Sequence, residues 1–309
     1  MFEPDIVVVG SHAPGLFIHV KRIPVAGETV MGWDYHEPVD GGKGSNQAVA
    51  AARLGAPVRF VGCLGRDERG DVAEQWLQAE GIDTAFVTRS ANRATIGGFV
   101  ILDEDGVPAI VAAMGANGDL TRADVDRALA ASRQARVLLT QFEIDPSLAL
   151  YAARRAREQE MTTIVNPAPA TPVEGLDVAD ILTPNESEAM VLLGLTPERP
   201  LPGKELARRL QCESGAKAVI VTLGERGAVV ATAGESWHTA APEVAVADTT
   251  GAGDAFNAAL AVTLTRGWTL SKSVPWACNV AALSVTRKGT IPIFPNAADV
   301  DAFTAQHEE

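Results

Sequence analysis

The sequence ADTTGAGDAF, residues 247–256, leads into an apolar run that extends to residue 264. Glycines at the start of a helix let backbone N–H groups approach an anion closely, and Gly251 and Gly253 stand at such a start. Asp254 falls in the first turn, where its carboxylate suits a general base that accepts a proton from an attacking hydroxyl. An aspartate at this place also caps a helix. The stretch therefore predicts either a phosphate-binding helix start or a glycine-rich cap.

A second glycine-rich sequence, DGGKGSNQA at residues 40–48, also leads into a helix-like run. It is not a P-loop, because Gly44 stands where that motif has Ser or Thr after the lysine. Three glycines together with Lys43 and Asn46 favour a loop that binds a polyol over a plain turn capped by Asn46. The sequence GSHAPG at residues 10–15 lacks the G-x-G-x-x-G spacing of a dinucleotide-binding turn, which disfavours a Rossmann dehydrogenase.

Short β-branched runs alternate with helix-like segments around these two sequences, a pattern typical of a parallel sheet covered by helices. The runs are almost wholly apolar, as burial on both faces requires. We therefore expect an α/β fold in which helices sandwich a mostly parallel sheet. The predicted strands are residues 6–9, 58–63, 137–140, 163–165, 181–182, 218–222 and 228–231, and the predicted helices are residues 46–54, 68–79, 146–160 and 203–211.

Two segments break this alternation, at about residues 16–40 and 95–113. Both have polar alternation and glycine-rich turns, which indicate strands of a separate, smaller sheet. Such a sheet would form a lid that closes a site against water. The chain shows no internal repeat or linker, so we expect residues 1–309 to form one domain with this lid.

Composition excludes several classes of function. Lys and Arg number 26 against 39 Asp and Glu, so the formal net charge is −13, which disfavours nucleic acid and anionic membrane surfaces as partners. No run approaches the ~18 to 20 apolar residues of a membrane-spanning helix. Three cysteines, Cys63, Cys212 and Cys278, lie far apart. Their odd number and spacing favour a reducing, cytoplasmic location.

The two glycine-rich sequences, in this order and at this separation, resemble the two signature motifs of the ribokinase-like (PfkB) carbohydrate kinases. The resemblance implies a three-layer α/β/α sandwich with a small β lid that covers the sugar and joins a homodimer. It implies an ATP- and Mg²⁺-dependent enzyme that phosphorylates a hydroxyl group of a small sugar or sugar-like polyol. Further matches lie at residues 10–11, 27–29, 41–50, 115–117, 166–169, 183–188, 222–224, 248–256 and 285–289.

Catalytic roles follow from the resemblance. It makes Asp254 the base that deprotonates the sugar hydroxyl, which agrees with the reasoning from the residues themselves. It also makes the backbone amides of Gly251, Ala252 and Gly253 the anion hole for the transferring phosphoryl group. On the sugar side, the residues that match the family's substrate site are Gly42, Lys43, Asn46, Glu143 and Asp254.

The nucleotide and metal residues also follow from the resemblance. Asn185 and Glu188 match a motif that organises Mg²⁺ largely through water, as a hard cation that keeps its hydration requires. Read alone, the same two residues indicate an acidic helix N-terminus. Thr222 and Gly224 match positions beside the nucleotide, as do Asn185, Gly251 and Gly253. Asn279 is the candidate for the adenine edge, since its neighbour Cys278 stands where the family has Asn or His.

A site for K⁺ is left open. Asp248, Thr250, Ser284 and Gly289 match the region where many members bind K⁺ beside the anion hole. Ile293 stands about where a hydroxyl is supplied in the family's ribose kinases, which would alter such a site.

The sequence departs from the family pattern at residues 13–15. The ribose kinases of the family have Asn-x-Asp there, and the aspartate accepts hydrogen bonds from adjacent ring hydroxyls. Ala13 and Gly15 cannot do so, and such a bond to a charged group contributes ~1.5 to 3 kcal/mol. Ribose is therefore in doubt, and Asp40 and His12 are the local candidates to compensate.

Two alternatives to a sugar kinase stay open. One is a nucleoside kinase of the same fold, which needs a lid-lined pocket wide enough for a base. The other is a sugar- or nucleotide-sensing protein without turnover, which would have no need of the base Asp254.

Overall fold

The main sheet is built around β1 (Ile6–Val9), whose four residues are all fully buried. β1 pairs in parallel with β4 (Val58–Val61) on one side and with β9 (Val137–Gln141) on the other. Burial on both faces explains why these strands are continuous apolar runs. The computed structural model describes residues 2–38, 41–105, 108–196, 201–287 and 293–307.

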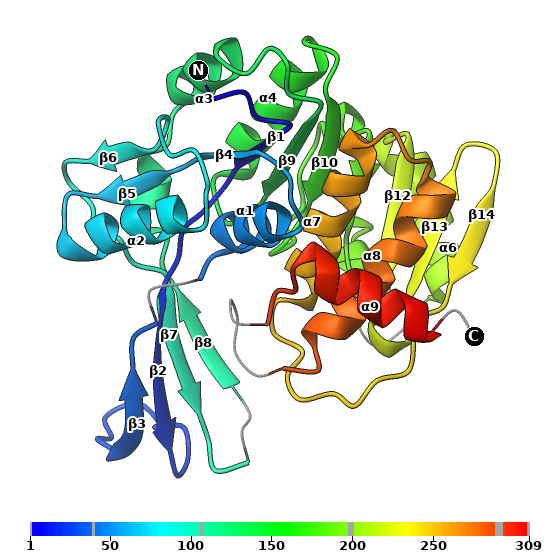
Figure 1. Ribbon diagram of the computed structural model, residues 1–309. Coiled ribbons are helices and arrows are strands. Elements are labelled where there is room, and N and C mark those ends of the chain that lie inside the picture. Colours follow the sequence, from blue (N-terminus) through cyan, green and yellow to red (C-terminus); the bar gives the residue numbers. More distant parts are fainter. Residues whose placement is uncertain (1, 39–40, 106–107, 197–200, 288–292, 308–309) are drawn as a thin grey trace.

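Among the described residues the main sheet has eight strands, in the order β14-β13-β12-β11-β10-β9-β1-β4. The neighbouring strands β12, β11, β10, β9, β1 and β4 are parallel to one another. β13 and β14 add to the β12 edge in antiparallel pairing. This is the mostly parallel sheet that the sequence predicts (Figure 1). The remaining strands are β10 (Thr162–Asn166), β11 (Ile181–Leu182), β12 (Ala218–Thr222), β13 (Ala228–Thr232) and β14 (Ser236–Thr239).

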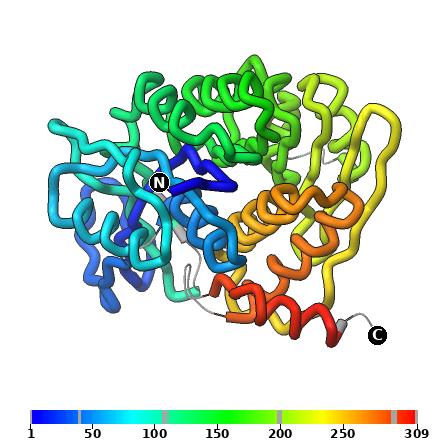
Figure 2. The backbone as a smooth tube through the Cα atoms, turned by 45° about the horizontal axis from the view of Figure 1, so that its top comes forward, coloured from blue at the N-terminus to red at the C-terminus, as the bar shows by residue number. Residues whose placement is uncertain are grey.

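Helices cover both faces of this sheet, so the molecule is an α/β/α sandwich (Figure 2). Side chains alternate between two hydrophobic clusters: Val7 and Val9 of β1 belong to one and Ile6 and Val8 to the other. The first cluster packs against α3 (Arg122–Ala130), α4 (Pro146–Arg157), α5 (Glu186–Leu192) and α6 (Gly203–Ser214). The second packs against α1 (Lys43–Arg53), α7 (Ala252–Thr265), α8 (Leu270–Ser284) and α9 (Ala297–His307).

A separate four-stranded sheet projects from the body at the lower left of Figure 1. Its order is β3-β2-β7-β8, so the two segments that break the alternation of the sequence lie side by side in it. We call this sheet the lid. Its strands are β2 (Gly15–Val20), β3 (Gly32–His36), β7 (Gly98–Leu102) and β8 (Pro108–Ala112).

The predicted strand at residues 58–63 is in fact two strands. β4 ends at Val61, and β5 (Cys63–Gly65) pairs with β6 (Thr88–Ser90) in a small sheet of its own. Gly62 allows the break, because a Cβ there would lie 2.7 Å from the Phe60 ring. The helix α2 (Glu68–Ala79) follows and has the predicted bounds.

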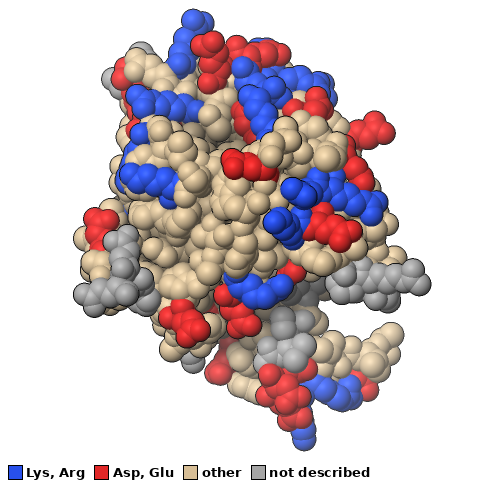
Figure 3. All heavy atoms as spheres, turned by 90° about the vertical axis from the view of Figure 1, so that its right-hand side faces the viewer, with Lys and Arg blue, Asp and Glu red and all other residues tan. Residues whose placement is uncertain are grey.

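The surface carries both signs of charge. On the face seen in Figure 3, Lys and Arg are interspersed with Asp and Glu. In the part of the chain that the structure describes, no helix is long and apolar enough to cross a membrane.

Candidate active site

The candidate residues meet where parallel strands of the main sheet end and α1 and α7 begin. β1 leads into the loop at residues 10–14, β9 ends at Gln141 and β10 ends at Asn166. In open α/β sheets, ligands bind outside the carboxyl ends of the strands. The same edge of the sheet therefore carries both glycine-rich sequences.

Asp254 lies in the first turn of α7 with 5% of its surface exposed. Its Oδ2 accepts a hydrogen bond from Asn46 Nδ2 at 2.9 Å, and its Oδ1 accepts one from Gln47 Nε2 at 2.9 Å. Both donors belong to α1. Two neutral amides thus hold the carboxylate in a fixed orientation without pairing it with a cation.

A buried network of amides supports this arrangement, and sequence reasoning missed it. Gln47 Nε2 also donates to Asn166 Oδ1 at 3.2 Å, and Gln141 Nε2 donates to Gln47 Oε1 at 2.5 Å. The signal was a polar residue that closes an apolar strand at its carboxyl end, as Gln141 and Asn166 both do. Because Gln47 is fully buried and shared by three partners, it orients Asp254 rather than substrate.

The second glycine-rich sequence packs its backbone directly on the loop that follows β1. A Cβ on Gly42, whose φ is 89°, would lie 2.5 Å from Ala13 N. A Cβ on Gly44 would lie 2.5 Å from Ser11 N. Glycine is therefore required at both positions by close approach, which brings the start of α1 onto the sheet edge.

Lys43 and Glu143 lie beside this contact. Glu143 Oε2 accepts hydrogen bonds from Ser11 Oγ at 2.5 Å and from the Lys43 backbone N–H at 2.7 Å. Burial by itself lowers the pKa of the Lys43 ammonium, but the carboxylates of Asp254, Glu143 and Glu188 outweigh it and raise the pKa above its ordinary value. The charge of Lys43 is therefore stabilised by three carboxylates of the candidate site.

The start of α7 has the geometry expected of an anion site. Gly251 is the N-cap with φ 79° and ψ −4°, and Gly253 has open space where a Cβ would stand. The first N–H groups of a helix lack partners within that helix. Ala252 N is an exception here, because it donates to Thr249 O at 3.3 Å. The opening above Gly253 is the place where an anion could meet the helix N-terminus.

Asn185 and Glu188 form a capping box at the start of α5. Glu188 N donates to Asn185 Oδ1 and Asn185 N donates to Glu188 Oε2, each at 2.8 Å. Burial raises the pKa of Glu188, while the Asn185 N–H and the Lys43 cation oppose that shift. The pair therefore has the capping role that the residues alone indicate, yet Glu188 also senses the charges of Lys43 and Asp254.

Two nucleotide candidates lie next to Asn185. Thr222 ends β12 and forms an isolated bridge with Asn185, and its N–H donates to Pro184 O at 3.0 Å. Gly224 follows with φ 61° and open space around it. Asn279 lies elsewhere, on α8, where its Nδ2 donates to Thr304 Oγ1 of α9 at 3.3 Å.

The candidate K⁺ residues are brought together only in part. The N–H groups of Ala247 and Asp248 both donate to Val285 O, at 2.7 and 3.2 Å, which places Asp248 beside the end of α8. Asp248 Oδ1 accepts from Thr250 N at 2.9 Å. The Ser284 hydroxyl donates within its own helix, to Ala281 O at 2.7 Å. Gly289 and its neighbour Lys288 lie outside the described residues.

Ile293 is fully buried against the start of α7. A Cβ on Gly251 would lie 3.3 Å from Ile293 Cδ1 and 3.3 Å from the Phe294 ring. A hydrocarbon side chain therefore occupies this side of the candidate cation region.

The His12 ring is buried between Ser45 of the second glycine-rich sequence and Trp76 of α2. The residue is 2% exposed, its Nδ1 lies 3.2 Å from Ser45 Oγ, and its ring centroid lies 6.1 Å from that of Trp76. Burial lowers the pKa of His12 to about 4, so the imidazole is neutral at pH 7. It is therefore placed as a packing residue. Asp40, the other compensating candidate, lies outside the described residues.

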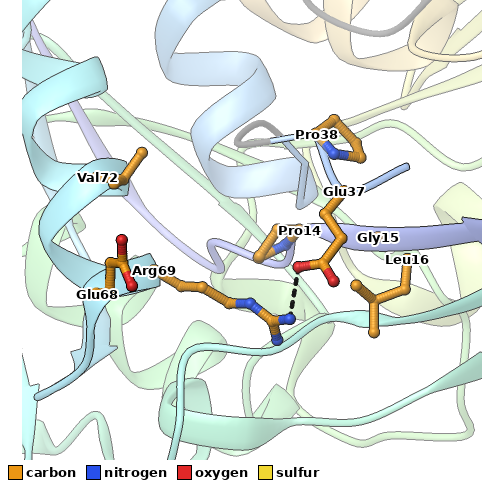
Figure 4. A pocket seen from close by; sticks show the side chains of 8 residues that line it. All are labelled: Pro14, Gly15, Leu16, Glu37, Pro38, Glu68, Arg69 and Val72. Atoms are coloured by element: carbon orange, nitrogen blue, oxygen red, sulfur yellow. Dashed lines mark hydrogen bonds and ion pairs between the residues drawn. The ribbon is translucent and has the colours of Figure 1, made fainter. Parts of the chain in front are cut away.

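Two surface clefts open away from this cluster. One, of about 410 Å³, lies between the lid and α2, lined by Pro14 and Leu16 on one side and by Glu68, Arg69 and Val72 on the other (Figure 4). Glu37 spans it through an ion pair of 2.6 Å with Arg69. The other cleft, of about 600 Å³, is lined by strand residues such as Thr162 and Ala218 at the amino ends of β10 and β12. Asp254 lines neither cleft, so the candidate active site rests on the geometry of the helix start and on the buried network rather than on a cleft.

Mg²⁺ would find a partial set of ligands here. No group of three or more His, Cys, Asp or Glu side chains that could hold a metal occurs among the described residues. Mg²⁺ keeps several waters and is commonly held by one or two carboxylates plus substrate phosphates. Glu188 fits that mode of binding, because its capping bond uses Oε2 and its charge interacts with those of Lys43 and Asp254.

Comparison with known proteins identifies the class. Residues 4–297 match the model of the pfkB family of carbohydrate kinases, and the chain belongs to that family. It is an ATP-dependent sugar kinase, a phosphotransferase that acts on a sugar hydroxyl.

Individual relatives and a solved structure show how similar the chain is to sugar kinases of known specificity. The chain is 35% identical to the ribokinase of Haemophilus influenzae over 292 residues, 94% of this chain and 95% of that protein. It is 30% identical to the deoxyribokinase of Salmonella typhi over 309 residues, 98% and 100% of the two chains. The structure of Arabidopsis thaliana ribokinase complexed with ribose and ATP superposes with a TM-score of 0.87 at 32% identity, covering 97% of this chain and 98% of that one.

Proposed function

We propose that this kinase transfers the γ-phosphoryl group of ATP to a hydroxyl of a pentose-sized sugar or polyol bound between the two glycine-rich sequences. The observation that carries the proposal is the contact between them: Asn46 of the first donates to Asp254 of the second at 2.9 Å. That contact supports a base at Asp254, in the first turn of α7, next to a polyol-binding loop. Phosphoryl transfer needs little more than such positioning together with charge stabilisation.

In this mechanism Asp254 accepts the proton of the attacking hydroxyl. Asn46 and Gln47 each donate a hydrogen bond to one of its two oxygens, so the carboxylate is held in one orientation. The backbone amides at Gly251 and Gly253 meet the charge that develops on the phosphoryl oxygens, and Ala252 N joins them when its 3.3 Å bond to Thr249 O opens. Lys43 supplies the positive side chain of the cluster, and its raised pKa keeps it protonated through neutral pH.

The substrate contacts follow from the same cluster. Glu143 uses one carboxylate oxygen, Oε2, for the protein bonds from Ser11 and Lys43, which leaves Oε1 to accept a sugar hydroxyl. Gly42 brings its backbone within reach of the sugar. On the nucleotide side, Asn185, Thr222 and Gly224 line the strand edge next to α5. Asn279 is the proposed adenine contact.

Mg²⁺ would be held by Glu188 and, through water, by Asn185, and it neutralises phosphate charge when bound. For K⁺ we propose Asp248 and the carbonyl of Thr250 as ligands. Since Ile293 and the engaged hydroxyl of Ser284 add no ligand there, we expect K⁺ to stimulate the enzyme weakly.

The base is tested by Asp254→Asn, which keeps the shape of the side chain and one acceptor for its two amide donors. We expect kcat for sugar-dependent ADP release to fall by roughly 10² to 10⁴-fold, the usual contribution of a general base. Asp71→Asn is the matched control, because Asp71 is an exposed first-turn acid of α2, outside the cluster. Unchanged turnover in Asp254→Asn would contradict the proposal.

We further propose that the lid joins two copies of the chain. Phe99 and Val111 are a cross-strand pair on the lid face opposite Phe17, and they are 46% and 63% exposed. Exposed apolar side chains that lie together on a sheet face are typical of an interface.

We also propose a cytoplasmic location. The three cysteines are free, with Cys63 and Cys278 buried, which supports it.

A further inference from the structure

A buried asparagine lies in the mostly apolar helix α7, about one turn after Asp254. Asn257 is 1% exposed. Asparagine is unfavourable inside a helix, because its amide competes with backbone hydrogen bonds, and a buried amide needs partners. The Nδ2 of Asn257 donates to Gly253 O at 2.8 Å, and its Oδ1 accepts from Thr183 Oγ1 at 2.6 Å. The second of these bonds reaches from α7 to the sheet.

Thr183 is fixed at the place where β11 ends. Its N–H donates to Val165 O of β10 at 3.1 Å, and its carbonyl accepts from Asn166 Nδ2 at 2.9 Å. The buried hydroxyl has one proton, which it gives to Asn257. Thr183 therefore joins the carboxyl edge of the sheet to the first turns of α7.

These bonds close a circuit with the amides that hold the base. Asn166 Oδ1 accepts from Gln47 Nε2 at 3.2 Å, and Gln47 Nε2 also donates to Asp254 Oδ1 at 2.9 Å. Asp254 follows Gly253 in the chain, so the path returns to the turn of α7 from which it started. We call the four buried side chains on this path the closed network: Gln47, Asn166, Thr183 and Asn257.

Two backbone carbonyls fix the direction of the donors in the closed network. A carbonyl oxygen can only accept a hydrogen bond, so Thr183 O and Gly253 O each bind the nitrogen of an asparagine side chain. The oxygens of these two amides then accept from Gln47 and from the Thr183 hydroxyl. Gln47 in turn presents its nitrogen, and not its oxygen, to the carboxylate of Asp254.

We propose that Thr183 and Asn257 are positioning residues for phosphoryl transfer, which act as one unit with Gln47 to fix the first turn of α7 against the sheet. The inference rests on the proposed function, since it takes Asp254 as the base. A displacement of about 1 Å among reacting groups can cost about 10²-fold in rate. Lys43 and Glu143, proposed to bind the sugar, lie outside the closed network, so its loss should lower kcat and spare KM for the sugar.

The test is Thr183→Val, which keeps the shape of the side chain and removes the hydroxyl. Ribose and 2-deoxyribose are the acceptors, at saturating Mg-ATP. We expect kcat for ADP release to fall by roughly 10- to 100-fold with little change in KM for the sugar. Thr183→Ser keeps the hydroxyl and should restore most of the lost turnover. An unchanged kcat in Thr183→Val, or an equal loss in Thr183→Ser, would overturn the inference.

The matched control is Thr163→Val. Thr163 is the second residue of β10, at the other end of that strand from Asn166, and it is fully buried. Its hydroxyl donates to Val178 O at 3.0 Å and to Asp180 Oδ2 at 3.2 Å. Thr163→Val should lower the melting temperature, as Thr183→Val does, and leave kcat unchanged. An equal loss of kcat in both variants would show that turnover follows stability, and it would overturn the inference.

A double-mutant cycle tests whether the closed network acts as one unit. Gln47→Met breaks the network on the side of α1, and Gln47 and Thr183 each bond to Asn166. We expect Thr183→Val to lower kcat much less in the Gln47→Met background than in the wild-type background. Losses that multiply in the double variant would overturn the inference. If the double variant fails to fold, the two Thr183 variants and their control decide the question.

Failure of the proposed function has a different signature. No ADP release with either sugar, or equal turnover by wild type and Asp254→Asn, would remove the proposed function and this inference with it. Asp254-dependent turnover that Thr183→Val leaves unchanged would overturn this inference alone.

Discussion

Some buried residues around the site have a structural role rather than a chemical one, and His12 is an example. Its imidazole has a pKa of about 4 because burial disfavours the charged form. In the unfolded chain the His12 imidazole becomes protonated below its ordinary pKa of 6.5, whereas in the native chain it stays neutral down to about pH 4. Stability contributed by His12 is therefore present above the unfolded pKa and is lost as the pH falls between these values.

This difference predicts a measurable pH dependence. Between pH 7 and pH 5 the wild-type chain should lose about 2 kcal/mol of unfolding free energy that His12→Asn does not lose. Asn keeps a polar atom near Ser45 and removes the titration, and the carboxylates common to both proteins cancel in the comparison. Denaturant unfolding at the two pH values measures it. Equal losses in the two proteins would show that His12 does not carry the effect.

At the scale of elements, two glycines at the start of α7 differ in whether their position requires glycine. Gly253 is helical with open space at its Cβ position, whereas Gly251 has φ 79° and a Cβ there would lie 3.3 Å from Ile293 and Phe294. Gly253→Ala should leave the melting temperature unchanged or slightly higher, since Ala favours a helix by ~0.5 to 1 kcal/mol. Its methyl group should nevertheless fill the anion opening and lower kcat/KM for ATP.

Gly251→Ala is the contrasting variant. It should lower both stability and activity, because a left-handed conformation costs a residue with a Cβ about 1 to 2 kcal/mol. Thermal melts and ATP kinetics on the two variants check the pair. Normal ATP kinetics in a well-folded Gly253→Ala would show that the phosphate does not approach this helix start.

The lid and α2 are joined by one ion pair, Glu37 to Arg69, across the cleft in Figure 4. Tyr35 also donates its hydroxyl to Glu37. If this link holds the lid over the acceptor, Arg69→Gln should raise KM for the sugar by up to about fivefold, the value of an exposed ion pair, with little change in kcat. The charge-reversed pair Glu37→Arg with Arg69→Glu should restore KM. A KM that rises equally in the reversed pair would assign the effect to local packing instead.

For the whole molecule, the exposed lid face predicts self-association. Val111→Lys places a charge in that face without disturbing the core. It should shift the protein from a dimer toward a monomer of 32.4 kDa. Val191→Lys on α5, at a position 38% exposed, is the matched control. Sedimentation equilibrium measures the shift. A wild-type chain that is monomeric at assay concentration would contradict the lid interface.

Much of the architecture could be predicted from the sequence, and the reason lies in the strands. β1, β11 and α2 have the predicted bounds because continuous apolar runs and a helix ending at glycine are local signals. The edge strand β14 was not predicted, since its half-exposed residues lack such a run. Asp254, Asn46, Lys43 and Glu143 were candidates and lie together. The amide network was missed because Gln141 and Gln47 are 94 residues apart, and only tertiary packing makes them partners.

The contact between Asn46 and Asp254 joins residues 208 positions apart in the chain. β1 also pairs with β9, and the first residue of β9, Val137, is synthesised long after β1. During synthesis β4 can pair with one edge of β1 early, but the other edge stays open until residues 137–141 have been made, and such an open edge is prone to aggregation. The base meets its amide donors only after residue 254 has been made. The contact that orients the base therefore forms late in synthesis, and a nascent fragment that stops before residue 254 lacks the base itself.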